Sequence, residues 1–174
     1  EERPFPLHLC LTQVVNAVSV AAYQKGLVLE MQITEKVPQE VVADKLRLRQ
    51  VLVHLLDNAV KFTVEGKVTL RVDGRPLGSN QWELTLVVQD TGVGIPPQKV
   101  ENIFEPFVVG DSSFSRQHQG AGLGLALCQK IIHQMNGQIE VKSKMGVGTT
   151  FQIVLPVAIT EKLPVVSQLE GQTG

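Results

Sequence analysis

The stretch Lys-Leu-Arg-Leu-Arg-Gln-Val-Leu-Val-His-Leu-Leu-Asp-Asn-Ala-Val-Lys-Phe-Thr, residues 45–63, has the strongest helical pattern in the sequence. Asp44 precedes it as a good N-cap, because its carboxylate can accept a hydrogen bond from a free backbone N–H of the first turn. At roughly 100° per residue, His54, Asn58 and Lys61 fall within about 60° of one another and form a polar stripe. A separate apolar face is made of Leu48, Val51, Leu52, Leu55, Ala59 and Phe62.

The polar stripe has two interpretations. It is a solvated face, which is the simplest one, or it is a binding surface. A surface selected only for solubility favours Lys, Glu and Arg, whereas His and Asn are only moderate helix formers. The amide oxygen of Asn58 suits hydrated Mg²⁺, Lys61 can meet a phosphate as a point charge, and His54 can act on a water or a hydroxyl group.

A glycine-containing segment, Asp-Thr-Gly-Val-Gly-Ile at residues 90–95, follows a predicted strand. Glycine lets the backbone approach a ligand closely. A carboxylate at the end of a strand can accept a hydrogen bond from an exocyclic amine such as that of adenine. Alone the pattern is weak, since Asp-x-Gly is also a common turn.

Two further glycine segments follow. Gly-Ala-Gly-Leu-Gly-Leu at 120–125 opens a predicted helix, and free N–H groups at a helix start favour phosphate. The spacing is not that of a Rossmann fingerprint, and the Gly-Lys-Ser/Thr of a Walker A loop is absent, so it indicates an anion site of neither type. Gly-Val-Gly-Thr-Thr-Phe at 146–151 is compatible with a simple hairpin connection.

The order of predicted elements indicates the fold class. Strands do not simply alternate with helices, so a mixed sheet with helices on one face is favoured over a doubly wound parallel sheet. Residues 108–121 are polar and aperiodic, which predicts a long loop with a function or without fixed structure. The predicted helices are 7–25, 45–63, 97–103 and 123–135. The predicted strands are 27–33, 68–72, 82–88, 138–143 and 149–156.

Composition narrows the class of protein. The 174 residues include 16 basic and 17 acidic side chains, which argues against a protein that coats nucleic acid. Cys10 and Cys128 are far apart in the sequence, so they predict free thiols and a reducing compartment. No apolar stretch approaches the roughly 18 residues that span a bilayer. The absence of an initial Met suggests a piece of a longer chain.

Together these segments resemble the ATP-binding domain of sensor histidine kinases, within the ATPase superfamily that also includes DNA gyrase B, Hsp90 and MutL. The resemblance covers residues from about 5 to 156 and is specific because five weak motifs occur in the right order. It implies a Bergerat-type two-layer α/β sandwich, with a mixed, mostly antiparallel five-stranded sheet and three main helices on one face. The five boxes are Leu46–Thr63, Asp90–Ile95, Ile103–Phe107, Gly120–Leu125 and Gly146–Phe151.

The resemblance implies ATP and Mg²⁺ as ligands. Asn58 would hold Mg²⁺ between the phosphates, Lys61 would contact phosphate, and His54 would stand where a catalytic base is found. Asp90 would bind the adenine amino group, and residues 108–121 would form the ATP lid. The other residues implied in ATP binding are Gly92, Gly94, Ile95, Phe107, Arg116, Gly120, Gly122, Leu123, Gly124, Leu125 and Thr149.

Some of these residues have more specific implied roles. Phe104 and Phe107 would hinge the lid, Arg116 would reach the γ-phosphate, and Thr149 would lie near the adenine. Gly94 would lie near the base. The residues that would close on the phosphates are Gly122, Leu123 and Gly124.

Some positions depart from the family pattern. His54 stands where many kinases have Asn and the ATPase relatives have Glu. Gln119 and Ala121 stand where Gly and Thr or Ser are frequent, which bears on the freedom of the lid to close. No histidine is followed by the Glu or Asp and the downstream Pro that mark a phospho-acceptor. The histidines are His8, His54, His118 and His133.

The resemblance also implies an organisation and partners. We expect an ATP-binding catalytic domain over 1–157 and a tail or linker over 158–174. The expected partners are the dimerisation and phospho-acceptor hairpin of the same protein and a response-regulator receiver domain, as in hybrid kinases. We expect no nucleic-acid partner and no direct membrane contact by this fragment. The domain would be cytoplasmic, with the full-length protein anchored in the bacterial inner membrane.

Three functions are compared. The first is a transferase that passes the γ-phosphoryl group of ATP to a histidine outside this chain. The second is a regulatory module that binds nucleotide or a partner without kinase activity, suggested by the altered lid. The third is an ATPase of the gyrase or Hsp90 type, against which His54 argues, since those enzymes have Glu there.

Overall fold

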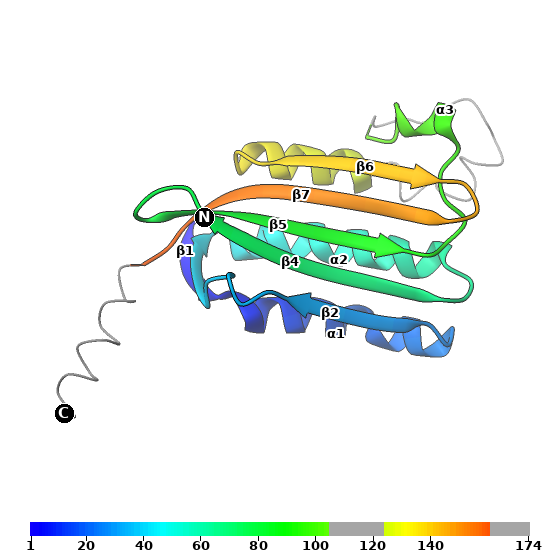
Figure 1. Cartoon of the computed structure of the whole chain (residues 1–174), viewed down its shortest axis with the longest axis horizontal. Helices are drawn as coiled ribbons and strands as arrows, with labels where there is room; N and C mark the ends of the chain where they lie inside the picture. Colours follow the sequence, from blue (N-terminus) through cyan, green and yellow to red (C-terminus); the bar gives the residue numbers. More distant parts are fainter. Residues whose placement is uncertain (105–123, 161–174) are drawn as a thin grey trace.

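A computed structural model of the chain describes residues 1–104 and 124–160. Helices and strands form two layers, with the sheet in front and the long helices behind it (Figure 1). The strands are β1 (Arg3–Pro6), β2 (Val28–Ile33), β3 (Glu40–Ala43), β4 (Lys67–Pro76), β5 (Gln81–Asp90), β6 (Gln138–Lys144) and β7 (Gly148–Ala158). The helices are α1 (Leu7–Gln24), α2 (Lys45–Phe62), α3 (Pro97–Val100) and a helix present over 124–134.

The sheet is mixed. Its order is β1-β3-β7-β5-β4-β2, and β6 pairs with β7 beside this path. Among the described strands, β2 and β4 pair in parallel and the other pairs are antiparallel. This confirms the predicted fold class, a mixed and mostly antiparallel sheet.

The number of strands differs from the prediction. The described residues form seven strands rather than five, because β1 and β3 pair with each other through a register that joins Phe5 to Val41. Prolines at positions 4 and 6 obscure the strand pattern of β1 in the sequence. Proline cannot donate a backbone hydrogen bond to a neighbouring strand, so it is found in strands at the edge of a sheet. The strand is indeed at the edge of the sheet, where these prolines cost no ladder hydrogen bond.

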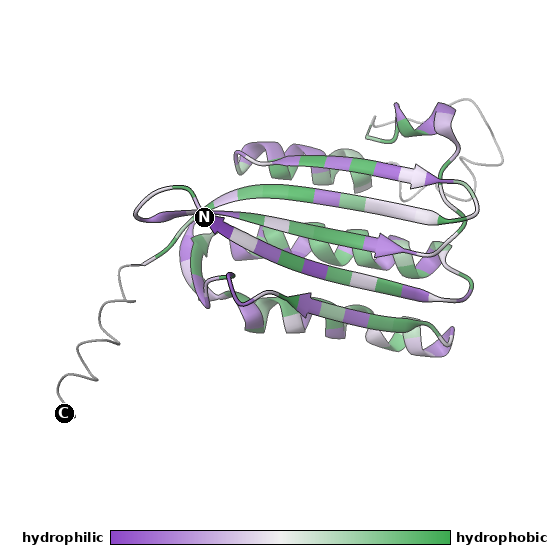
Figure 2. Cartoon of the chain, viewed as in Figure 1, coloured by the Kyte–Doolittle hydropathy of each residue, from purple (hydrophilic) through white to green (hydrophobic). Residues whose placement is uncertain are grey.

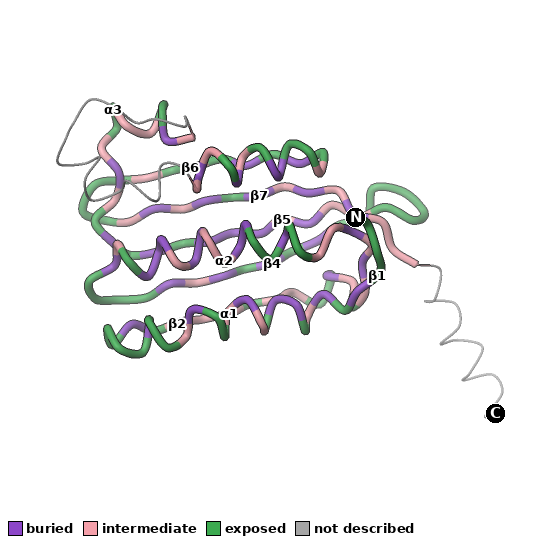
Figure 3. Tube along the Cα trace, turned by 180° about the vertical axis from the view of Figure 1, so that it is seen from behind, coloured by how far each residue is buried: buried purple, intermediate pink, exposed green. Residues whose placement is uncertain are grey.

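Three helices cover one face of the sheet. Seen from behind, α1, α2 and helix 124–134 lie across the same side (Figure 3). Apolar and polar residues alternate along β4, so this strand gives one face to the helices and one to solvent (Figure 2). The side chains at the centre of this core are completely or almost completely buried; the largest are Leu7, Leu11, Leu48, Leu52, Leu55, Leu56, Leu70, Leu84, Leu86, Ile132, Ile153 and Leu155.

The ends of α2 follow from its sequence. Asp44 is the N-cap, and its Oδ1 accepts a hydrogen bond of 3.1 Å from the backbone N–H of Arg47. At the other end, the Thr63 hydroxyl donates to the carbonyl of Ala59 at 2.7 Å. The helix spans 45–62 as predicted to within one residue, so its polar stripe has a fixed direction relative to the sheet.

Both cysteines are buried free thiols. Burial raises the pKa of the Cys128 thiol to about 12 and also raises the pKa of Cys10. In the described part of the chain, no helix combines the length and the hydropathy that a membrane crossing requires.

Candidate nucleotide-binding site

Three of the segments that the sequence singled out, within the described residues, meet at one end of the sheet. The carboxyl end of β5, the end of α2 and the β6–β7 hairpin lie at the right-hand end of the sheet in Figure 1. The register places Asp90, the last residue of β5, directly opposite Thr149 on β7. Residues about 60 positions apart in the sequence therefore lie side by side.

Asp90 is the buried acid of this cluster. It is 9% exposed, and its Oδ1 accepts hydrogen bonds from the backbone N–H groups of Gly92 at 2.8 Å and Thr149 at 3.2 Å. Burial raises the pKa of the Asp90 carboxyl, and these two backbone donors oppose the shift. Among the described residues, none donates to Oδ2. The carboxylate is thus held through one oxygen, and the other can accept a hydrogen bond from a ligand.

Ser143 extends this network and was missed by the sequence analysis. Its Oγ accepts a hydrogen bond of 2.6 Å from the backbone N–H of Ile95, and it lies 3.1 Å from the Thr149 hydroxyl and 3.2 Å from the Gly148 carbonyl. Ser143 pairs with Thr149 across β6 and β7. The only sequence signal was its position before a hairpin, so the role becomes visible only once the strand register is known.

Two glycines let the loop after β5 pack tightly. A Cβ on Gly92 would lie 2.5 Å from the carbonyl oxygen of Phe62, which is backbone and cannot give way. Gly94 has a φ of +80°, a conformation that side chains other than glycine rarely adopt. The loop therefore sits against both the end of α2 and the β6–β7 hairpin, with Ile95 buried beneath it.

The polar stripe of α2 lies in the half of the helix nearest to this end. Asn58 is only 7% exposed, which is unusual for an amide on a helix surface. Lys61 is exposed and forms an ion pair of 3.5 Å with Asp57. The stripe is therefore not a uniformly solvated face, because its central residue, Asn58, is buried.

His54 packs against the start of helix 124–134. A Cβ on Gly124 would overlap the His54 imidazole, so this position accommodates only glycine while the ring keeps its place. The Nε2 atom is buried and, within the described residues, has no hydrogen-bond partner. Burial lowers the pKa of His54; the Asp57 carboxylate opposes this and Lys61 adds to it. The lowered pKa favours the neutral imidazole.

Asn58 is a candidate Mg²⁺ ligand among the described residues of this end. No group of three or more His, Cys, Asp or Glu side chains that could hold a metal is present in residues 1–104 and 124–160. Asn58 supplies a neutral oxygen of the kind that Mg²⁺ accepts, and Mg²⁺ usually completes its shell with water and phosphate oxygens. The donor set fits a nucleotide-borne ion better than a protein-held one.

Other predicted site residues differ in their placement. Leu125 is 3% exposed and belongs to the hydrophobic core. Phe104, the expected hinge of the lid, packs edge-on against Phe151 with ring centroids 6.2 Å apart. Outside the described residues lie Phe107, Arg116, Gly120, Gly122, Leu123 and the expected lid, 108–121.

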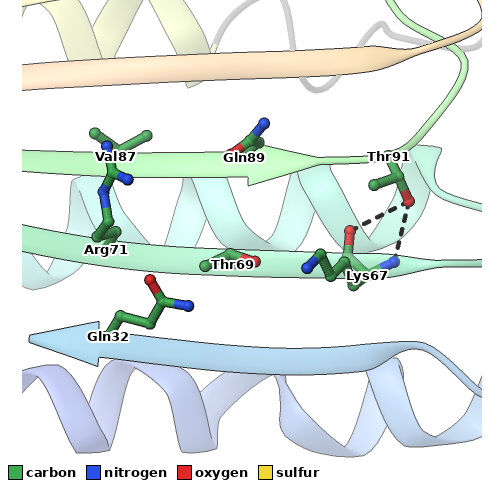
Figure 4. Close-up of a pocket in the computed structure, with 7 residues that line it drawn as sticks. All are labelled: Gln32, Lys67, Thr69, Arg71, Val87, Gln89 and Thr91. Atoms are coloured by element: carbon green, nitrogen blue, oxygen red, sulfur yellow. Dashed lines mark hydrogen bonds between the residues drawn. The ribbon is translucent and has the colours of Figure 1, made fainter.

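A separate pocket of about 220 Å³ lies on the opposite, open face of the sheet (Figure 4). Lys67 and Thr91 are bonded to each other there, because the Lys67 N–H donates to the Thr91 hydroxyl at 3.0 Å and the Thr91 N–H donates to the Lys67 carbonyl at 3.1 Å. These bonds fix the start of β4 to the loop after β5. None of the predicted nucleotide-binding residues lines this pocket, so it is distinct from the Asp90 site.

Comparison with known proteins agrees with this geometry. Residues 43–159 match the family described as histidine kinase-, DNA gyrase B- and HSP90-like ATPase. The chain is 38% identical over 151 residues to the signal transduction histidine-protein kinase BarA of Escherichia coli. This alignment covers 87% of this chain and 16% of BarA. It is also 38% identical over 165 residues to the hybrid signal transduction protein dokA of Dictyostelium discoideum, covering 92% of this chain and 10% of dokA.

Solved structures give the same result. Full-length ShkA in complex with AMPPNP superposes with a TM-score of 0.79 at 33% identity, over 92% of this chain and 32% of ShkA. The nucleotide-free catalytic domain of histidine kinase ThkA superposes with a TM-score of 0.68 at 25% identity, over 90% of this chain and 95% of that domain. The chain spans 10–16% of the length of the two curated relatives above. It belongs to the histidine kinase-, DNA gyrase B- and HSP90-like ATPase family, as an ATP-binding catalytic domain of the sensor histidine kinase type.

Proposed function

We propose that this chain binds Mg-ATP at the carboxyl end of β5 and transfers the γ-phosphoryl group to a histidine on a separate helical hairpin of the same protein. The observation that carries the proposal is the buried Asp90 carboxylate, held through Oδ1 by two backbone N–H groups. A buried acid with one oxygen fixed is suited to accept a hydrogen bond from the amino group of adenine. The kinase relatives and the AMPPNP complex of ShkA support the choice of nucleotide.

The adenine half of the site would be formed by the β5 end and its loop. Asp90 would bind the amino group, while Thr149 and Ser143 hold Asp90 and the Ile95 backbone in place. The buried Ile95 and the close packing of Gly94 would give the base an apolar surface. In this half the protein supplies fixed hydrogen-bond geometry, which sets specificity for the base.

The phosphate half would be formed by α2 and the second glycine segment. Asn58 would hold Mg²⁺, which neutralises the charge that develops on the transferred group. Lys61 would contact phosphate, and Gly124 together with residues 120–123 would offer backbone N–H groups at a helix start. Arg116 in the lid would reach the γ-phosphate, and Phe107 would hinge the lid with Phe104.

His54 would not act as a strong base in this scheme. Burial lowers the pKa of its imidazole, which makes it a weaker base than a free histidine, and the ring has no carboxylate charge. The gyrase-type reaction, in which a Glu activates water, is therefore not favoured. The regulatory alternative receives no support from BarA, whose name is that of a histidine-protein kinase.

The rest of the full-length protein would supply the partners. The acceptor hairpin would present its histidine to the γ-phosphate, and a receiver domain would take the phosphoryl group onward, as the name of the hybrid protein dokA suggests. Anchoring of the full-length protein in a bacterial inner membrane belongs to the same proposal. The balanced charge of the chain, 16 basic against 17 acidic residues, gives no reason to add a nucleic-acid partner.

The test uses the full-length protein with Mg-ATP labelled on the γ-phosphate. We expect an acid-labile, base-stable phosphohistidine that is lost in Asp90→Ala and in Asn58→Ala. Lys142→Met, on the exposed side of β6, is the matched control and should label normally. Nucleotide binding without any phosphohistidine in the wild type would contradict the transferase and favour the regulatory module.

A further inference from the structure

We infer that Lys25 is a positioning residue for the phosphate half of the site, because its ammonium group bonds to backbone carbonyls in the last turn of α2 and so fixes that turn. This inference rests on the proposed function. Lys25 follows α1, and its Nζ donates hydrogen bonds to the carbonyl oxygens of Val60 at 2.7 Å and Lys61 at 3.0 Å. No nucleotide-binding role was expected for this residue from the sequence.

The bonds satisfy carbonyls that a helix end leaves free. The last four carbonyls of an α-helix have no partner within the helix, and a cation there also interacts favourably with the helix dipole. In α2, the Ala59 carbonyl accepts from the Thr63 hydroxyl, and the next two accept from Lys25. Side chains therefore cap this end, and one of them reaches it from 35 positions away in the sequence.

The capped turn is the one that carries the phosphate-binding residues. Asn58 and Lys61 lie on either side of Val60, so fraying of this turn displaces both. The following carbonyl, that of Phe62, is the atom against which Gly92 packs. A fixed α2 end therefore sets the distance between the phosphate half and the adenine half.

Lys25 acts through α2 and not through the ligand. Its two side-chain bonds end on backbone carbonyls, and its own backbone N–H caps α1 by bonding to the carbonyls of Ala21 and Ala22 at 3.3 and 3.2 Å. Removal of the ammonium group therefore leaves the α1 cap in place. A substitution of Lys25 can therefore remove the bonds to α2 without removing the cap of α1.

The experiment compares Lys25→Met, which keeps the apolar stem, with Lys25→Arg, which keeps the positive charge. Binding of Mg-ATP and of adenosine is measured by calorimetric titration, well below the unfolding temperature of each variant. We expect Lys25→Met to weaken Mg-ATP binding about five- to tenfold, with adenosine binding within about twofold of wild type and most of the loss restored in Lys25→Arg. Lys142→Met is the matched control and should bind both ligands as wild type does.

A second readout needs no ligand. Amide hydrogen exchange at Phe62 and Thr63 should be faster in Lys25→Met than in wild type, because the last turn loses its cap. Unchanged Mg-ATP affinity in Lys25→Met, or an equal loss for adenosine and Mg-ATP, would overturn the inference. A wild-type chain that binds no nucleotide would contradict both the proposed function and this inference. Normal nucleotide binding by the wild type, together with equally tight binding by Lys25→Met, would contradict the inference only.

Discussion

The two halves of the candidate site are built in different ways. In the adenine half, Asp90, Ser143 and Thr149 are tied to one another or to nearby backbone by hydrogen bonds between buried or half-buried groups. In the phosphate half, Lys61 is exposed and its ion pair with Asp57 is a surface contact, which is worth little. The Nε2 atom of His54 has no partner among the described residues.

This difference indicates that the two halves of the site have different roles. The strands hold the groups that we propose bind the base in a hydrogen-bonded network. The groups on the helix side that we propose bind phosphate and Mg²⁺ have fewer fixed partners among the described residues. Substitutions in the adenine half should therefore weaken adenosine and ATP binding equally, whereas substitutions in the phosphate half should weaken ATP binding selectively.

The largest effect is expected from Gly92→Ala. The added Cβ would lie 2.5 Å from the Phe62 carbonyl and 3.0 Å from Asp90 Oδ1, so the loop must move. Overpacking of this kind costs about 1–3 kcal/mol, and we expect roughly thirtyfold weaker binding of adenosine and ATP alike. Titration of both ligands measures it. Gly78→Ala is the matched control, since nothing lies within 4 Å of a Cβ there; equal behaviour of the two variants would argue against a preformed adenine half.

Gly124→Ala tests the phosphate half. Its methyl group would overlap the His54 ring, so the start of helix 124–134 should shift and Mg-ATP binding should weaken by about tenfold, with adenosine binding little changed. The second substitution His54→Ala makes room for the methyl group. A double-mutant cycle should therefore show recovery, whereas strictly additive losses would mean that the two residues do not interact.

Ser143→Ala should have a smaller effect. It removes the acceptor of the Ile95 N–H bond, and one hydrogen bond contributes about 1 kcal/mol, or about fivefold in the affinity for adenosine and ATP. Ser19→Ala, whose hydroxyl bonds locally within α1, is the control and should leave binding unchanged. A loss for ATP alone would move Ser143 from the adenine half to the phosphate half.

The smallest effect concerns pH. Because burial lowers the pKa of His54, the folded chain binds fewer protons than the unfolded chain, in which histidine titrates near ~6.5. The His54 contribution to the free energy of unfolding should therefore fall as the pH drops from about 6.5 towards the lower folded pKa. Proton NMR of the ring should give a pKa below ~6.5 in the free chain, and a value at or above that would show that the ring is not desolvated.

The sequence predicted those features that depend on local pattern. Helix α2 was bounded to within one residue, because its apolar period and the Asp44 cap are local signals. The strand pair β1–β3 was missed, because prolines 4 and 6 hide the strand pattern of β1.

Features that depend on pairing between distant segments could not be predicted in this way. Ser143 matters only because the β6–β7 register brings it to Thr149. Leu125, which the glycine segment predicts at the nucleotide, also belongs to the apolar core, a contact that depends on helix 124–134 packing on the sheet. Lys25 follows α1 and bonds to the end of α2, and no local sequence pattern predicts such a contact.

The most direct test is a calorimetric titration of ATP into the chain with and without Mg²⁺, for the wild type, Asn58→Ala and Asp90→Ala. We predict that the wild type binds more tightly with Mg²⁺, that Asn58→Ala loses this Mg²⁺ dependence, and that Asp90→Ala binds at least about tenfold more weakly under both conditions. A wild-type chain that shows no binding at millimolar nucleotide would contradict the nucleotide site.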